Sequence, residues 1–309
     1  MGLIDKVRAT MKCQETEGPF ELYVTRTPGY LWACLFKWLG IHPITITLTS
    51  IVIGAASGCF FYPHDLKTNL IGIALLIGAN WLDCADGQLA RMTNKRTLIG
   101  RILDGFAGDI WFFVIYVAFC LRTATDMIPF TQITWGPWIW LLAAWAGLHC
   151  HAHQCSLGDR LRNIHMYFKL GKEKAELDDS RMIKSEMRAL RWNWKEWFQK
   201  LYLFFYARYT AGQERQTKAF HLMKQKLEEK YGDHLPEEIR EDFCKHSRPI
   251  MPLANLLSTD LRMMVMFLCI IIGQVWIYFL FEATVLEALR HYTINRYENL
   301  CKRITKQYT

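Results

Sequence analysis

No cysteine pair in this sequence has the C-x2-C spacing of a metal-ligand motif. The ten cysteines are scattered, and several lie inside apolar stretches, among them Cys59, Cys120 and Cys269. We therefore expect neither a zinc-ribbon site nor a disulfide framework, and the cysteines should pack as small core residues. A basic face with interleaved aromatic residues is missing too, so nucleic-acid binding is not expected. Residues 1–30 lack an apolar run with a small-residue cleavage site, so no signal peptide is expected.

Charge is scarce in four long stretches and dense elsewhere. The average composition is that of a soluble protein, since 21% of the 309 residues are charged and the mean hydropathy is +0.03. However, residues 45–63, 69–90, 99–121 and 135–150 each approach the roughly 20 apolar residues that span a bilayer, whereas 156–257 is densely charged. The net charge of +8 and the 12 tryptophans suit an anionic leaflet with aromatic anchors at the interface. The pattern predicts an integral membrane protein with one large polar insertion.

We expect an all-α fold with about six transmembrane helices. Two further apolar segments, 263–272 and 275–289, are separated by Gly273 and Gln274 and complete that number. Residues 30–39 read as an amphipathic juxtamembrane helix at the membrane surface. The expected domains are a cytosolic N-terminus with this interfacial helix (1–43), four transmembrane helices (44–155), a helical cytosolic insertion (156–257), and the last transmembrane helices with a basic tail (258–309).

Basic residues set the expected orientation. Lys95 and Arg96 follow the second apolar segment, and Arg122 begins a short outer loop with few cations. Because cytoplasmic loops carry the excess of Lys and Arg, the end of the second segment is expected to face the cytosol. With no organelle address in the sequence, the expected location is a bacterial inner membrane.

Carboxylates stand inside two of the apolar segments, where an ionisable residue suggests function. Asp83 and Asp86 are three residues apart and share a helix face, and Asp104 lies on the next helix. Small residues on the same faces would let the two helices approach; they are Gly87, Ala90, Thr97 and Gly100. The gathered carboxylates would repel one another unless cations neutralise them. An all-oxygen site of this kind favours Mg²⁺ or Mn²⁺.

The spacing Asp-x2-Asp-Gly-x2-Ala-Arg-x8-Gly-x3-Asp, from Asp83 to Asp104, resembles the signature of the CDP-alcohol phosphotransferase family. The resemblance covers the first 120 residues well and the rest mainly in layout. It implies that the acids bind two divalent metal ions, that the glycines and the arginine hold a CDP group, and that a final acid acts as base. Carried over by position, the implied metal ligands are Asp83, Asp86, Asp104 and Asp109, and the implied nucleotide contacts are Gly87, Ala90, Arg91, Thr97 and Gly100.

The last acid departs from the family pattern. The position expected for it is Gly108, and the acid comes one residue later as Asp109. On a regular helix Asp109 stands about 140° round the axis from Asp104, whereas the expected position stands about 40° round. A one-residue π-bulge in the glycine-rich run 105–108 would restore the geometry. We therefore expect Asp109 to be the displaced fourth acid and, with Asp104, a catalytic residue; the alternative is that Asp109 caps or solvates the helix.

The resemblance implies an enzyme of phospholipid synthesis, which moves a substituted phosphate group from a CDP-linked donor to an alcohol and releases CMP. We favour CDP-diacylglycerol with inositol or inositol phosphate; the alternative pair is a CDP-aminoalcohol or CDP-inositol with diacylglycerol or a ceramide. One substrate is then a lipid, and a homodimer is expected because this family is commonly dimeric. His149 and His153 are candidate contacts to the acceptor, or ordinary polar residues of the interface. Two hypotheses from other functional classes are a divalent-cation transporter and a noncatalytic scaffold.

Overall fold

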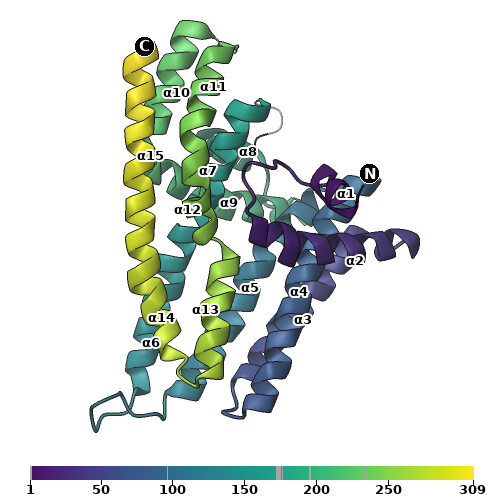
Figure 1. The fold of residues 1–309 in the computed structure, drawn as a ribbon, viewed down its shortest axis with the longest axis vertical. Helices are drawn as coiled ribbons and strands as arrows, with labels where there is room; N and C mark the ends of the chain where they lie inside the picture. The colour runs from purple at the N-terminus through teal and green to yellow at the C-terminus, as the bar shows by residue number, and fades with distance from the viewer. Residues whose placement is uncertain (1, 96, 172–174, 176, 195, 233) are drawn as a thin grey trace. The chain divides into compact units, whose positions relative to one another are not determined.

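The computed structural model describes residues 2–95, 97–171, 175, 177–194, 196–232 and 234–309. Arg96, used above for the orientation, lies outside this range, as do the side chains at 98, 99, 101 and 102. Every regular element in the described chain is a helix, which confirms the predicted all-α class (Figure 1). The chain divides into two compact units, unit 1 with residues 1–150 and 260–284, and unit 2 with residues 151–259 and 285–309.

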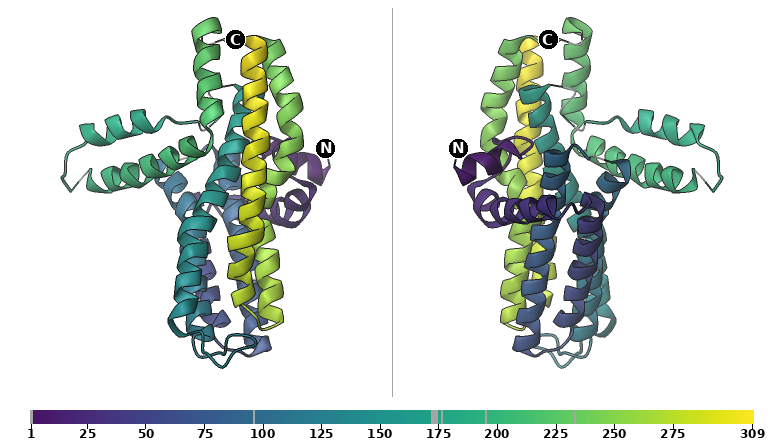
Figure 2. Two further views of the ribbon diagram at one scale, coloured as in Figure 1. Left: turned by 90° about the vertical axis from the view of Figure 1, so that its left-hand side faces the viewer. Right: turned by 90° about the vertical axis from the view of Figure 1, so that its right-hand side faces the viewer.

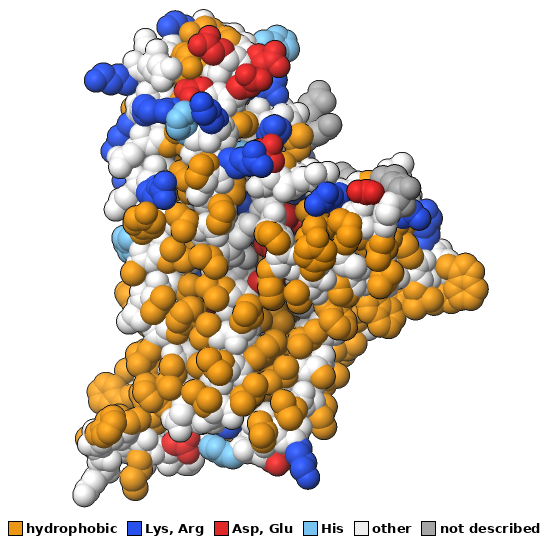
Figure 3. All heavy atoms as spheres, viewed as in Figure 1, with side chains coloured by type: hydrophobic (Ala, Val, Ile, Leu, Met, Phe, Trp, Pro, Cys, Tyr) orange, Lys and Arg blue, Asp and Glu red, His pale blue; other side chains and the backbone are white. Residues whose placement is uncertain are grey.

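Unit 1 contains the segments of highest hydropathy. Its helices are α1 (Leu3–Ala9), the π-helical η1 (Glu21–Arg26), α2 (Thr27–Trp38), α3 (Pro43–Phe61), α4 (Leu66–Thr93), α5 (Leu98–Thr123), α6 (Gly136–Ala144), α13 (Thr259–Ile271) and α14 (Trp276–Phe281). Hydrophobic side chains cover much of its surface over α2, α3 and α13 (Figure 3). Such a surface is expected of helices that face lipid.

Unit 2 is a helical bundle with a hydrophobic core of its own. Its helices are α7 (Ala152–Leu170), α8 (Ser180–Ala189), α9 (Trp197–Gln216), α10 (Lys218–Tyr231), α11 (Glu237–Ser247), the short 3₁₀ helix η4 (Arg248–Ile250), α12 (Met251–Leu256) and α15 (Glu287–Tyr308). The rings of Phe168 and Phe243 stack in this core with centroids 3.8 Å apart. Two π-helical segments, η2 (Trp145–His151) and η5 (Glu282–Leu286), lie where the chain passes between the units.

Four stretches of the described chain are long and apolar enough to cross a membrane: Pro43–Phe61, Leu66–Thr93, Leu103–Thr123 and Glu237–Ile271. The first three correspond to predicted spans, and the fourth overlaps the predicted span 263–272. The other two predicted spans are helical, but π-helical segments divide them into shorter pieces. The protein is a membrane protein, and the number of six spans stays a prediction, as do the domain limits.

Glycines let α3, α4 and α5 pack closely. A Cβ atom on Gly54 of α3 would stand 2.3 Å from Nε1 of Trp111 on α5, and one on Gly72 of α4 would stand 2.6 Å from the ring of Phe61. Small residues at such crossings are typical of membrane helices, where close packing replaces the hydrophobic effect as the source of association. The three helices that carry the acidic motif and its neighbours are therefore held at short range.

A buried ionic network joins α5, α13 and α14. The Glu282 carboxylate accepts hydrogen bonds from the Tyr116 hydroxyl, from the Tyr278 hydroxyl at 2.7 Å, and from the Arg262 guanidinium. Arg262 and Glu282 have no exposed surface. A charge inside a bundle is tolerated when it is paired and hydrogen-bonded in this way. Arg122 is also buried and donates to the Phe61 carbonyl at 3.1 Å, so it is part of the packing of α5 and not a free cation of the outer loop.

The segment before the first span is helical and crosses α4 (Figure 1). Gly29 of α2 lies against α4, because a Cβ there would stand 2.8 Å from Cβ of Cys84. On the other side of α2, large apolar side chains are exposed; they are Leu31, Trp32, Leu35 and Trp38. This distribution is compatible with the interfacial helix expected from the sequence.

Replacing Gly54 should test the close packing of α3 on α5. We expect Gly54→Ala to lower the free energy of unfolding by about 1–3 kcal/mol, because the buried Trp111 ring must shift to admit the methyl group. Gly78→Ala on α4 is the matched control, since nothing lies within 4 Å of a Cβ there. This control should be neutral or more stable by up to roughly 1 kcal/mol. Thermal unfolding in detergent measures both, and equal melting temperatures for the two variants would contradict the packing described here.

Candidate active site

The turn between α4 and α5 brings two helix ends together. Helix α4 ends at Thr93, and Asn94 takes the left-handed conformation with φ of 53°. Asparagine is one of the few residues other than glycine that adopt this conformation readily. Helix α5 then begins after Thr97, whose hydroxyl accepts a hydrogen bond from the Gly100 N–H at 3.0 Å. The chain therefore reverses within a few residues and sets the start of α5 beside the end of α4.

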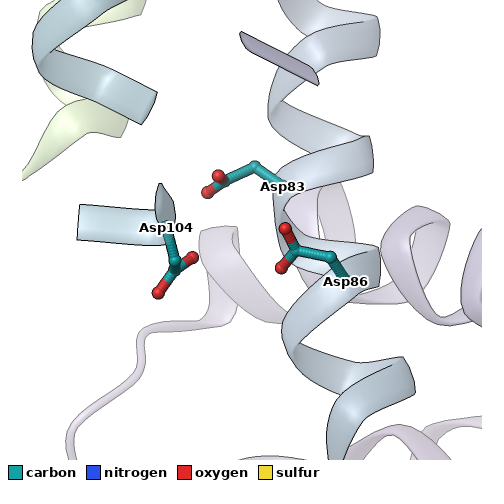
Figure 4. Close-up of side chains that lie close together, drawn as sticks. All are labelled: Asp83, Asp86 and Asp104. Atoms are coloured by element: carbon teal, nitrogen blue, oxygen red, sulfur yellow. The ribbon is translucent and has the colours of Figure 1, made fainter. Parts of the chain in front are cut away.

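Three carboxylates converge beside this turn. Asp83 and Asp86 of α4 and Asp104 of α5 each offer an oxygen atom, and these atoms all lie within 4.8 Å of one another. Figure 4 shows the three side chains turned toward a common point. Asp86 is buried, Asp83 is half-buried and Asp104 is exposed, so the group is open on the α5 side. Three like charges at this separation repel strongly in a medium of low dielectric.

The oxygen atoms of this group are incompletely hydrogen-bonded. The Thr47 hydroxyl on α3 donates to Oδ2 of Asp86. Oδ1 of Asp83 is buried and has no hydrogen-bond partner within the described part of the chain. A buried acceptor without a donor is costly unless something else satisfies it. Hard oxygen donors, mutual repulsion and an unused lone pair together fit a divalent cation such as Mg²⁺ or Mn²⁺.

A cation stands next to the acids on the same helix. A Cβ on Gly87 would lie 3.4 Å from a terminal nitrogen of Arg91, so the guanidinium lies beside this glycine. Arg91 also attracts the charge of Asp86 electrostatically. Ala90 is half-buried and keeps the same surface of α4 small. The glycine, the alanine and the arginine of the motif are thus adjacent to the carboxylates.

Thr97 and Gly100 have a structural task at this site. The Thr97 hydroxyl caps α5, and a Cβ on Gly100 would come within 3.0 Å of that same oxygen. The cap accounts for the threonine at 97 without a ligand, and a Cβ at 100 would require only a small shift of the Thr97 side chain. Their predicted contact with a nucleotide stays a prediction.

Asp109 does not join the group of three. Helix α5 is α-helical throughout Leu98–Thr123, so the π-bulge expected over 105–108 is wrong. Regular helix geometry leaves Asp109 about 140° round the axis from Asp104. Asp109 is exposed, and the group of carboxylates within ligand distance contains Asp83, Asp86 and Asp104. Gly105 and Gly108 have open space around them, so they do not force a distortion. Its catalytic role stays a prediction.

Sequence reasoning missed two neighbours of the acids, Thr47 and Arg26. Arg26 of η1 forms a salt bridge with Glu17 at 2.8 Å, and its positive charge attracts Asp83. Its carbonyl accepts a hydrogen bond from Nε2 of Gln88 at 3.2 Å, which fixes η1 on α4. These contacts join segments about 40 to 60 residues apart in the chain, so no local spacing reveals them.

The candidate histidines lie in the helical stretch that follows α6. His149 of η2 stacks on Trp145 with ring centroids 4.4 Å apart and belongs to unit 1. His151 and His153 belong to unit 2. The suggested contact of His149 and His153 with an acceptor stays a prediction.

Comparison with known families decides the identity of this region. Residues 41–153, which include the three carboxylates and Arg91, match the family model of CDP-alcohol phosphatidyltransferase. Residues 41–153 belong to the CDP-alcohol phosphatidyltransferase family. This confirms the predicted family, which is a family of transferases that move substituted phosphate groups from a CDP-alcohol to an acceptor in phospholipid synthesis. Members of the family use divalent metal ions. Searches of curated proteins and of solved structures found no match.

Metal binding should stabilise this phosphatidyltransferase domain, and the substitution Asp83→Asn should reduce that stabilisation. In EDTA we expect Asp83→Asn to melt at the same temperature as the wild type or higher, because one of three repelling charges is gone. Added Mg²⁺ or Mn²⁺ should raise the melting temperature of the wild type more than that of the variant.

The control for this experiment is Asp65→Asn, at the other end of α4. Asp65 caps that helix through the Thr68 N–H at 2.9 Å. Because Asn caps a helix about as well as Asp, this change should leave the melting temperature nearly unchanged, with and without metal. An equal gain from the metal in the wild type and in Asp83→Asn would contradict the assignment of the site.

Proposed function

We propose that this protein transfers a phosphatidyl group from CDP-diacylglycerol to inositol or inositol phosphate and releases CMP. The observation that carries the proposal is the convergence of Asp83, Asp86 and Asp104 around an unused Asp83 oxygen, with Arg91 beside them. A pyrophosphate-linked donor needs this combination, because its negative charge must be neutralised before a phosphorus–oxygen bond can break.

The three acids would hold two Mg²⁺ or Mn²⁺ ions. When bound, such ions neutralise phosphate charge and polarise the phosphoryl oxygens. Thr47 supports this arrangement, because its hydrogen bond fixes the orientation of the Asp86 carboxylate. Asp104 contributes from the opposite helix, so the distance between α4 and α5 sets the separation of the ligands.

The end of α4 and the start of α5 would bind the nucleotide. Arg91 would pair with a donor phosphate, since a guanidinium presents two parallel N–H donors to phosphate oxygens. Gly87, Ala90 and Gly100 would leave space for the cytidine. The Thr97 hydroxyl, already an acceptor at the cap, would still have its own O–H to donate.

Asp109 would take the proton from the attacking hydroxyl. The acceptor oxygen then forms a bond to the phosphorus, the bond from phosphorus to CMP breaks, and the proton moves to the carboxylate. Because Asp109 stands outside the group of three, we assign it this role ahead of a role as fourth metal ligand. Asp104, on the same helix, would help to hold the donor phosphate through its metal ion while Asp109 removes the proton.

Cations near the acids favour an anionic or polyol acceptor. Arg26 lies close enough to attract Asp83 electrostatically, and the guanidinium of Arg91 lies beside Gly87 of the motif. An acceptor that carries a phosphate would meet both charges. The alternative within the class is a CDP-aminoalcohol or CDP-inositol donor with diacylglycerol or a ceramide as acceptor.

For the whole chain we propose about six spans, with α2 at the interface. The site would face the cytosol of a bacterial inner membrane, unit 2 would contain most of the cytosolic insertion, and the enzyme would be a homodimer. Lys95, next to the motif, agrees with this orientation.

CMP release separates the candidate activities. The purified protein in lipid nanodiscs is given each CDP-linked donor with a polyol or lipid acceptor, with and without Mg²⁺. We expect metal-dependent CMP release from CDP-diacylglycerol with inositol or its phosphate, and none after Asp104→Asn. Release only from a CDP-aminoalcohol or CDP-inositol would select the alternative pair. Divalent-ion flux into sealed liposomes that contain the same protein, without CMP release, would favour a transporter, and neither signal would favour a scaffold.

The proposed base is tested by Asp109→Asn. We expect kcat to fall by about 10²–10⁴, the usual contribution of a general base, while the metal still raises the melting temperature. Asp126→Asn, beyond the end of α5, is the control and should keep full turnover. A kcat equal to that of the wild type in Asp109→Asn would assign proton removal to another group.

A further inference from the structure

Helices α8 and α9 form a hairpin that projects from the other helices of unit 2 (Figure 2). The two helices pack on each other through a small core of their own, with Ile183 of α8 against Leu203 and Ala207 of α9. Toward its C-terminal end α9 meets α7, where Nε2 of Gln213 donates to the Ser156 carbonyl at 3.1 Å. The hairpin is therefore a folded part of the unit and not a loose loop.

The other face of α9 is apolar and exposed. It carries large side chains that recur three, four and seven residues apart; they are Trp197, Phe198, Leu201, Phe204 and Phe205. Two further tryptophans lie in the turn before α9, and Trp192 is 73% and Trp194 92% exposed. Single exposed apolar residues are normal, but a continuous aromatic patch marks an interaction surface.

Cations accompany this aromatic face. The amine of Lys200 lies 5.3 Å from the centre of the Trp192 ring, and the guanidinium of Arg208 lies 5.7 Å from the centre of the Phe204 ring. Residues 180–209 contain seven Lys or Arg against two Glu, a large part of the net charge of +8 of the whole chain. Tryptophan beside Lys and Arg, with an apolar helix face between them, is the composition of a helix that lies in a membrane interface.

We infer that the α8–α9 hairpin binds the surface of an anionic bilayer, with the exposed face of α9 in the headgroup region. The aromatic rings enter the boundary between headgroups and acyl chains, and the surrounding cations attract the lipid phosphates. A second copy of this chain is the less suitable occupant, because two hairpins of the same positive sign would repel each other. This role is independent of the reaction at the three acids.

Photo-crosslinking in the full-length protein tests this inference. Phe205→p-benzoylphenylalanine places a photoreactive ring on the exposed face of α9, and Ser185→p-benzoylphenylalanine on the exposed side of α8 is the matched control. Each variant is reconstituted in nanodiscs of neutral lipid alone or with phosphatidylglycerol, irradiated and analysed by mass spectrometry. We expect lipid adducts at 205, several-fold more with the anionic lipid, and few or none at 185.

Three outcomes would overturn the inference. Crosslinks from 205 to a second chain, without lipid adducts, would assign the face to an interface between copies. No adduct at 205 would mean that the face stays in water. Equal yields in both kinds of nanodisc would contradict the preference for anionic lipid. Circular dichroism of each variant shows that the helices are intact, so a negative result is not caused by misfolding.

Discussion

The mutual repulsion of Asp83, Asp86 and Asp104 is the constraint on which the rest of unit 1 depends. Their oxygens lie within 4.8 Å of one another, in segments whose length and hydropathy suit a membrane. Such an arrangement persists only if the surrounding helices are held close by other means or if cations offset the charge. The structure provides the first through close glycine contacts between helices and through the capped turn between α4 and α5. Divalent cations would provide the second, and the same cations would neutralise the phosphates of a CDP-linked donor.

Two sets of contacts outside the motif support this arrangement. The N-terminal segment lies on α4, where the Val24 and Arg26 carbonyls accept hydrogen bonds from Trp81 and Gln88. This places Arg26 where its charge acts on Asp83. In another part of unit 1, the paired charges of Arg262 and Glu282 join α13 to the residue that follows α14 and, through Tyr116, to α5. A network of this kind disfavours sliding of one helix along another, because any shift would leave a buried charge unpaired.

The sequence predicted the features that depend on local spacing. Asp83 and Asp86 share a helix face because they are three residues apart. A break between helices was expected at Gly273, and this glycine has a positive φ of 72°, which glycine adopts readily. It did not predict the partners Thr47 and Arg26, since these contacts join distant segments. The prediction of a π-bulge before Asp109 was wrong. It rested on the family pattern, which has a fourth acid close to the other three, whereas α5 is a regular α-helix. The sequence predicted only a basic tail, whereas α15 also buries Tyr297, Leu300 and Ile304 in the core of unit 2. The density of charged residues in this segment did not by itself indicate the apolar face of α15.

Divalent-metal binding by the three acids is the central claim, and Mn²⁺ binding followed by electron paramagnetic resonance tests it most directly. Free Mn²⁺ gives a signal that weakens on binding, so a titration of the purified protein yields both affinity and stoichiometry. The account predicts that the wild type binds about two ions and that Asp83→Asn and Asp104→Asn each weaken this binding strongly. Unchanged Mn²⁺ binding in both variants would contradict it.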